Sequence, residues 1–247
     1  MASKNARPEN ESSAMLVVSN LSKSFVLHTQ GSAQISVFDN LAMEVCAGEC
    51  VVLDGPSGAG KSTLMRMLYA NYRTDSGAIR VRHDGTLVDL TAAEPRTVLD
   101  IRRRTLGYVS QFLRVIPRVA TLDVVAEPLR ALGVEADDAH ERARTMLARL
   151  NVPERLWGLA PATFSGGEQQ RVNVARGFVA ELPILLLDEP TASLDAINRQ
   201  CVMSLIEDAK ARGAAIVGIF HDREVRECAA DRVFDMRETL AANGEAA

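Results

Sequence analysis

Long hydrophobic runs are missing from this 247-residue sequence, and positive charge is not in excess. The longest clean apolar run, residues 214–220, is much shorter than the roughly 18 to 20 residues that a membrane-spanning helix needs. The sequence therefore predicts no direct insertion into a bilayer, and any membrane role would need a partner chain. The formal net charge is −4, which argues against nucleic acid or an anionic membrane surface as a direct partner.

Cysteine is also scarce, and the start of the chain lacks an apolar signal core. Residues 1–14 are polar and charged, so we expect a disordered leader and a cytoplasmic protein. The hydrophobic content of 47% can fill a globular core. The cysteines form no C-x-x-C pair and have no clustered histidines nearby. We expect all four to be buried or half-buried small hydrophobes: Cys46, Cys50, Cys201 and Cys228.

A glycine-rich stretch has the complete pattern G-x-x-x-x-G-K-[ST], between a strand-like run at 49–53 and a helix-like run at 63–68. Its glycines let successive N–H groups converge on phosphate oxygens at a helix N-terminus. Lys61 would meet the β- and γ-phosphates of a nucleotide, and Ser62 would offer a hydroxyl to Mg²⁺. The alternative is a glycine-rich turn with a solvated lysine. The predicted nucleotide cradle comprises Gly55, Pro56, Ser57, Gly58, Ala59, Gly60, Lys61, Ser62 and Thr63.

The remaining pattern predicts an α/β protein. Short strands are expected at 16–18, 23–27 and 35–38, and a hairpin at 79–90 is expected to join the same antiparallel sheet. A helix is predicted over 138–150, and Ser165 with Glu168 forms a capping-box pattern at the start of another. Buried strands at 184–187 and 214–220 flank a helix at about 198–212, which indicates a parallel α/β unit.

Two adjacent carboxylates, Asp188 and Glu189, follow the buried strand at 184–187. The carboxyl edge of a parallel sheet is where open α/β sheets bind ligands, so Asp188 could hold Mg²⁺ while Glu189 faces an attacking water. Gln111 and His221 also follow strand-like runs. By itself, each of these residues would fit an ordinary polar loop or strand end. They become candidate site residues only because the chain also has a complete phosphate loop.

The glycines at 166 and 167 open a second helix N-terminus able to bind an anion. Together with the loop at 55–62, Gln111, Asp188-Glu189, the turn at 193–195 and His221, this motif resembles the nucleotide-binding domains of ABC ATPases, over about residues 15–235. The resemblance implies a P-loop fold with a parallel sheet core, an antiparallel β subdomain and a helical signature subdomain at about 112–180. It places the ATPase domain at 15–238 and a tail at 239–247.

The same resemblance implies Mg²⁺-dependent ATP hydrolysis by a head-to-tail homodimer, or by a heterodimer with a related ATPase. Glu189, His221 and Gln111 would be catalytic, and Ser62, Gln111 and Asp188 would hold Mg²⁺. Phe164 stands where the family usually has leucine, and Glu168 where it usually has glutamine. Besides the phosphate loop, the resemblance implies further nucleotide contacts. Phe25 would stack on adenine, and Asp195 would make a contact across the dimer. The signature-like residues would also bind the nucleotide: Ser165, Gly166, Gly167 and Glu168.

Stretches outside these motifs are similar to one branch, the ATP-binding L subunit of the bacterial carbon-phosphorus lyase system: 69–72, 110–118, 150–157 and 213–222. Membership would imply soluble lyase-system partners and a role in forming ribose 1-methylphosphonate 5-triphosphate. A transporter ATPase of the lipoprotein-release or efflux type shares every catalytic residue and stays an alternative. A non-catalytic scaffold is disfavoured by Glu189 and His221. Asp54, a carboxylate beside the phosphate loop, has no explanation in the sequence.

Overall fold

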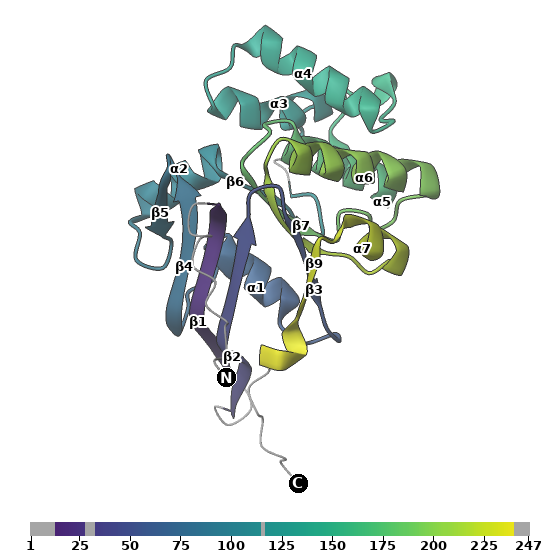
Figure 1. Ribbon diagram of the computed structural model, residues 1–247. Helices are drawn as coiled ribbons and strands as arrows, with labels where there is room; N and C mark the ends of the chain where they lie inside the picture. The colour runs from purple at the N-terminus through teal and green to yellow at the C-terminus, as the bar shows by residue number, and fades with distance from the viewer. Residues whose placement is uncertain (1–12, 28–32, 115–116, 240–247) are drawn as a thin grey trace.

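Two sheets and the helices between and around them form the molecule (Figure 1). The computed structural model describes residues 13–27, 33–114 and 117–239. The antiparallel sheet has the order β2-β1-β4-β5, with β1 at Ala14–Leu27, β2 at Ala33–Cys46, β4 at Ser76–His83 and β5 at Thr86–Asp89. The parallel sheet has the order β6-β7-β8-β3-β9, with β6 at Leu106–Val109, β7 at Ile184–Asp188, β8 at Ala215–Ile219, β3 at Cys50–Asp54 and β9 at Arg232–Asp235.

The helices cover both faces of the parallel sheet. Helix α1 lies between the two sheets in Figure 1, while α3 and α4 form the top of the molecule above α5 and α6. The bounds are α1 Lys61–Leu68, α2 Pro95–Arg104, α3 Thr121–Ala131, α4 Ala136–Arg149, α5 Gly166–Phe178, α6 Ala196–Ala211 and α7 Arg223–Ala229. Short 3-10 turns occur at Glu154–Leu156, Pro161–Thr163 and Met236–Thr239.

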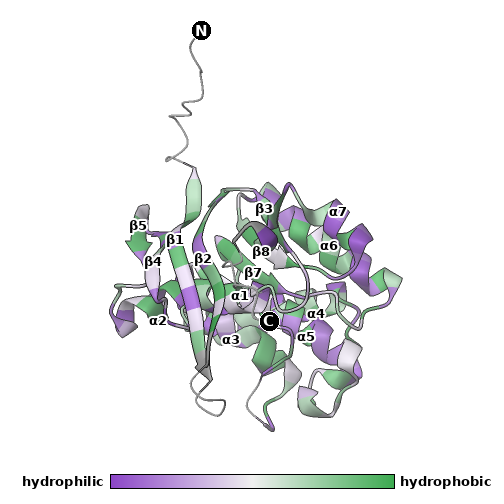
Figure 2. Cartoon of the chain, turned by 90° about the horizontal axis from the view of Figure 1, so that it is seen from below, coloured by the Kyte–Doolittle hydropathy of each residue, from purple (hydrophilic) through white to green (hydrophobic). Residues whose placement is uncertain are grey.

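The parallel sheet separates two hydrophobic clusters, because successive side chains of a strand point to opposite faces. On β7, Leu185 and Leu187 belong to the cluster under α3 to α7, whereas Ile184 and Leu186 face α1 and the antiparallel sheet. All of these side chains are buried. Figure 2, viewed from below, shows hydrophobic residues along β7 and β8 in the middle of the molecule. A strand buried on both faces reads as a continuous apolar run, which is why the sequence revealed it.

The predicted architecture of a parallel sheet with an antiparallel sheet and helices is confirmed. The hairpin at 79–90 joins the antiparallel sheet as expected. The two strands expected at 16–18 and 23–27 are one continuous strand, β1. The sequence suggested two strands because a register shift between Ser19 and Ser22 interrupts the alternation of apolar and polar residues. Asn20 has φ 50 there, and a Cβ on Gly77 would lie 2.3 Å from the Asn20 carbonyl oxygen, so the irregularity requires glycine opposite it.

One prediction about the cysteines is wrong. Cys50 is buried and Cys46 and Cys201 are half-buried, but Cys228 is exposed. On α7 the apolar side chains facing the core are Val225 and Ala229, four residues apart, and Cys228 lies on the outer side of that face. The predicted leader falls almost entirely outside the described residues, as does most of the predicted tail, so both stay predictions.

Candidate functional site

The phosphate-loop sequence connects the carboxyl end of β3 to the amino end of α1. Gly58 and Gly60 have φ values of 86 and 87, a left-handed conformation that side-chain-bearing residues avoid. A Cβ on Gly60 would also lie 2.5 Å from Cγ1 of Val37, so only glycine fits against β2. Among the described residues, no side chain caps the amino end of α1. The N-terminal amides of this helix are therefore available to an anion.

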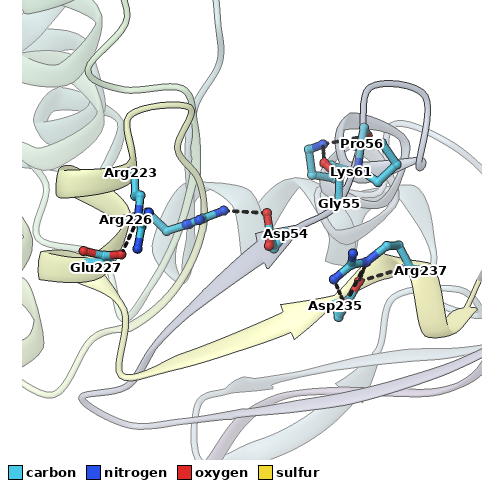
Figure 3. Close-up of polar contacts among 9 residues, drawn as sticks. All are labelled: Asp54, Gly55, Pro56, Lys61, Arg223, Arg226, Glu227, Asp235 and Arg237. Carbon is cyan, nitrogen blue, oxygen red and sulfur yellow. Dashed lines mark hydrogen bonds and ion pairs between the residues drawn. The ribbon is translucent and has the colours of Figure 1, made fainter.

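Lys61 is held over this loop by the loop itself. Its Nζ donates hydrogen bonds to the carbonyl oxygens of Gly55, at 2.5 Å, and Pro56, at 2.9 Å, and Figure 3 shows the side chain folded back over both residues. The ammonium group therefore lies above the helix N-terminus, where phosphate oxygens could replace the two carbonyls. The described geometry fits a triphosphate with respect to both charge and backbone donors.

Asp54, which the sequence left unexplained, forms an ion pair with α7. Arg226 Nη1 donates to Asp54 Oδ1 at 2.6 Å, and the side chains are 30% and 36% exposed. Figure 3 shows Arg226 reaching from α7 to the end of β3. The guanidinium neutralises the carboxylate that precedes the phosphate loop, so this charge is compatible with an anion nearby. Sequence reasoning missed Arg226 because the partners are separated by 172 positions.

The carboxylates Asp188 and Glu189 lie at the carboxyl end of β7, at the same sheet edge as the phosphate loop. Asp188 is 5% exposed and accepts a hydrogen bond from the Tyr108 hydroxyl at 3.1 Å. Burial raises the pKa of Asp188, and the neighbouring charge of Glu189 adds to that rise, whereas the Tyr108 bond opposes it. A buried carboxylate with few compensating partners is suited to a cation.

Glu189 is the meeting point of the predicted catalytic residues. Its Oε1 lies 2.7 Å from His221 Nε2, and its Oε2 accepts a hydrogen bond from Gln111 Nε2 at 3.3 Å. These side chains come from three loops that follow β7, β8 and β6 respectively. Because the three strands are parallel neighbours, their carboxyl ends converge at one edge. Gln111, Asp188, Glu189 and His221 thus form one cluster, although they are far apart in the sequence.

The signature-like residues form a second cluster at the start of α5. The Ser165 amide and hydroxyl donate to Glu168 Oε2 at 2.9 and 2.7 Å, and the Glu168 amide returns a bond to Ser165 Oγ, which completes the predicted capping box. These bonds with Ser165 lower the pKa of Glu168. A Cβ on Gly167 would lie 3.0 Å from the Ser193 carbonyl oxygen, so the glycine permits close approach of the turn that carries Asp195.

Asp195 and Phe25 are placed by other contacts. Asp195 caps α6, where both of its carboxylate oxygens accept bonds from Asn198. Phe25 is 37% exposed, and its ring lies edge-on to Tyr72 with centroids 5.9 Å apart. The described side-chain hydrogen bonds of Ser165 go to Glu168 and those of Asp195 to Asn198, and none of them reaches the Lys61 loop of the same chain. The amino ends of α1 and α5 thus differ: that of α1 has no side-chain cap, and that of α5 carries the capping box of Ser165 and Glu168.

The predicted metal ligands are suited to a divalent cation by their side-chain chemistry. Within the described ranges, no group of three or more His, Cys, Asp or Glu residues could hold a metal. Mg²⁺ usually takes only one or two protein carboxylates and completes its shell with water and phosphate oxygens. The Asp188 carboxylate, the Ser62 hydroxyl and the Gln111 amide oxygen are ligands of this hard-oxygen type. No helix in the described part of the chain has both the length and the apolar character needed to cross a membrane.

Comparisons with known proteins agree with this geometry. The sequence pattern described as ABC transporter matches residues 38–192. An uncharacterised ABC transporter ATP-binding protein of Mycobacterium tuberculosis is 35% identical over 216 residues, which cover 87% of this chain and 64% of that protein. The pyoverdine export ATP-binding/permease protein PvdT of Pseudomonas aeruginosa is 35% identical over 209 residues, which cover 84% of this chain and 30% of PvdT. The chain thus spans less than two thirds of the length of these relatives.

A solved structure extends the comparison to an assembled cassette. The dimeric ATP-binding cassette MJ0796, in a post-hydrolysis state bound to ADP and Pi, superposes with a TM-score of 0.80 at 28% identity. The match covers 90% of this chain and 94% of MJ0796. The predicted fold class is therefore confirmed at the level of the ATP-binding cassette, with its two sheets and its helices.

Proposed function

The chain belongs to the ABC transporter family, and from this premise we propose that it binds and hydrolyses ATP as the nucleotide-binding part of a membrane transporter. The observation that carries the proposal is Glu189, held between His221 and Gln111 beside the buried Asp188. A structural ion pair would not need this convergence of four polar groups at the edge that also carries a phosphate loop. The test is Mg²⁺-dependent phosphate release by the purified chain, which should disappear when the cation is chelated.

The proposed roles follow from position. The amides of Gly58 to Ser62 and the ammonium of Lys61 would bind the β- and γ-phosphates, exchanging the Gly55 and Pro56 carbonyls for phosphate oxygens. Mg²⁺, when bound by Ser62, Asp188 and Gln111, would neutralise charge that develops on the phosphates. Glu189 would accept the proton of the attacking water, with His221 and Gln111 fixing its orientation. Phe25 would stack on the adenine ring.

A head-to-tail dimer would bring the second anion site into use. Ser165, Gly166 and Gly167 would bind the γ-phosphate held by Lys61 of the other subunit, and Asp195 would make a further cross-dimer contact. The dimeric state of MJ0796 supports this arrangement. With Glu189→Gln, ATP should produce a dimer in light scattering and ADP should not, because the variant retains both anion sites but cannot hydrolyse the nucleotide. A monomer with ATP, both alone and with the partner chain, would contradict the head-to-tail arrangement.

The partner proposed is a membrane permease at the cytoplasmic face, because the relatives named above are transporter ATP-binding proteins. The proposed contact lies after β6, where Phe112 is 68% exposed between Gln111 and Arg114. An exposed aromatic ring beside arginine is typical of residues that dominate binding at interfaces. Residues 115 and 116 of the same loop lie outside the described residues. Co-purification of a multi-span membrane protein with the tagged chain would support this partner.

A second candidate is the carbon-phosphorus lyase system, favoured by the distinctive sequence at 69–72, 110–118, 150–157 and 213–222. In that case the partners would be soluble, and the ATPase would support formation of ribose 1-methylphosphonate 5-triphosphate. The relatives support the transporter, so we place the lyase second. A pull-down from phosphate-starved cells separates the two, since it recovers either a membrane permease or soluble phosphonate-processing proteins.

A further inference from the structure

Two buried amide side chains project from the same face of α5. Gln170 and Asn173 are each 5% exposed, and a spacing of three residues places them one above the other on the helix. Buried amides need hydrogen-bond partners, and such residues are costly in a helix that could carry apolar side chains instead. Both find their partners outside the helix, in two of the loops that carry the proposed catalytic residues.

Gln170 binds the backbone of Glu189. Its Nε2 donates to the Glu189 carbonyl oxygen at 3.1 Å, while the Glu189 amide donates to Ile219 O at 3.0 Å. Glu189 has a φ of 55, in the left-handed region that is unfavourable for a glutamate. A residue keeps such a conformation only where its surroundings over-determine it. The Ala192 amide also donates to the Glu189 carbonyl oxygen, at 3.1 Å. Gln170 is thus one of three groups that fix the peptide units on either side of Glu189, and the only side chain among them in the described residues.

Asn173 binds the backbone next to Gln111. Its Nδ2 donates to the Ser110 carbonyl oxygen at 2.5 Å, and Gln111 then reaches Glu189 with its own amide. Asn173, Gln111 and Asp188 line the same cavity, of about 680 Å³. Without the Asn173 bond, the loop after β6 would lose its only described side-chain hydrogen bond to α5, and Gln111 could move away from Glu189.

We propose that Gln170 and Asn173 are positioning residues, which hold Glu189 and Gln111 in their hydrolytic arrangement and couple that arrangement to the position of α5. This inference rests on the proposed ATP hydrolysis. Helix α5 begins at Gly166, directly after Ser165, so its amino end would contact the nucleotide of the other subunit while its buried amides hold the catalytic pair of its own. A shift of α5 on dimer formation would then reach both Gln111 and Glu189 in the same chain.

The first test replaces Asn173 by a side chain of similar size without a donor. In Asn173→Leu we expect turnover to fall by about 10- to 100-fold, because a small displacement of a catalytic group is enough for such a loss. The affinity for ATP should stay within about twofold, since Asn173 does not touch the phosphate loop. If Asn173→Leu does not fold, as judged by thermal melting, the isosteric Asn173→Asp replaces it and carries the same expectation.

The matched control is Arg142→Met. Arg142 Nη2 donates to the carbonyl oxygen of Val179, the residue that caps the carboxyl end of α5, at 3.1 Å, so it also bonds a side chain to the backbone of this helical segment, but at the end away from the site. This variant should lower the melting temperature with turnover unchanged. Equal loss of turnover in both variants would mean that any weakening of α5 slows the reaction, and it would overturn the positioning role.

A double-mutant cycle decides whether Asn173 acts through Gln111. In a Gln111→Ala background, Asn173→Leu should cause no further loss of turnover, because the group that it positions is already gone. Multiplied losses would overturn the inference, and so would full turnover in Gln111→Ala or in Asn173→Leu alone. These failures differ from failure of the proposed function, in which the wild-type chain itself releases no phosphate from ATP.

Discussion

Replacing Glu189 by glutamine should stop turnover and leave nucleotide binding intact. The exchange preserves the size of a side chain that is only 17% exposed and lies between His221 Nε2, at 2.7 Å, and Gln111 Nε2, at 3.3 Å. The amide oxygen can still accept a bond from one of these neighbours. The new side chain cannot accept a proton from water, however. Its NH₂ group donates hydrogen bonds, so it also replaces one of the two carboxylate oxygens that accept bonds in the wild type.

The size of the effect follows from the role of a positioned base, whose loss costs about 10² to 10⁴ in rate. At 1.36 kcal/mol for each factor of ten, the transition state would rise by about 2.7 to 5.4 kcal/mol. Binding should change much less, because the described bonds of Glu189 go to His221, Gln111, Gln170, Ala192 and Ile219 and not to Lys61 or its loop. The variant should therefore change the rate and not the affinity.

The assay compares phosphate release with ATP affinity from a fluorescent-nucleotide titration. Glu181→Gln is the matched control, because Glu181 is exposed and its closest cation, Arg212, is 3.9 Å away. That control should hydrolyse ATP at the wild-type rate. Undiminished phosphate release by Glu189→Gln would remove Glu189 from the mechanism. A parallel loss of ATP affinity would show that the residue binds nucleotide instead of activating water.

Three further outcomes are expected. Lys61→Ala should weaken ATP binding by about 10- to 100-fold in a titration, the range of a hydrogen bond from a charged group, and equal affinity would contradict the cradle. Because the Ser165 hydroxyl and amide lower the pKa of Glu168 from its ordinary 4.5, the charge of Glu168 stabilises the fold above that pH and loses this effect as pH falls below it. At neutral pH the free energy of unfolding of Glu168→Gln should thus be about 0.3 to 1 kcal/mol lower than that of wild type, and this difference should disappear in acid. A difference that does not change with pH would contradict this. Phe112→Ser should keep basal ATP hydrolysis but lose the partner chain in a pull-down, whereas normal recovery would place the contact elsewhere.

The features that the sequence predicted well are local. The phosphate loop depends on glycines within six positions, and the capping box of Ser165 and Glu168 on a spacing of three. Each pattern can be recognised in the sequence because the residues that form it are close neighbours along the chain. The strand at 184–187 could be recognised because both of its faces are buried and every residue is apolar. Asp188 and Glu189 could then be placed at the sheet edge, because they follow that strand without a gap.

The features that the sequence did not predict depend on contacts between distant segments. Gln170 and Asn173 look like surface-type polar residues in a helix, and only the packed fold buries them against loops from elsewhere in the chain. Cys228 was expected to be buried, but the short helix α7 gives too few positions for its apolar face to be identified by periodicity. Strand β1 was divided in two, because an irregular register hides a continuous strand from any test of alternation.

Asp54 offers a last prediction, about charge beside the phosphate loop. If Arg226 neutralises Asp54, Arg226→Ala should weaken ATP binding by about two- to fivefold, the strength of a partly exposed ion pair, and added salt should reduce the effect. Asp54→Asn should bind ATP normally, and Asp54→Asn combined with Arg226→Ala should recover that affinity. Arg223→Ala removes the same charge from α7, but Arg223 pairs with Glu227 in an exposed contact at 2.6 Å, as Figure 3 shows. Equal losses in the two arginine variants, or no recovery in the double variant, would mean that Arg226 acts through the general field of α7 and not through Asp54.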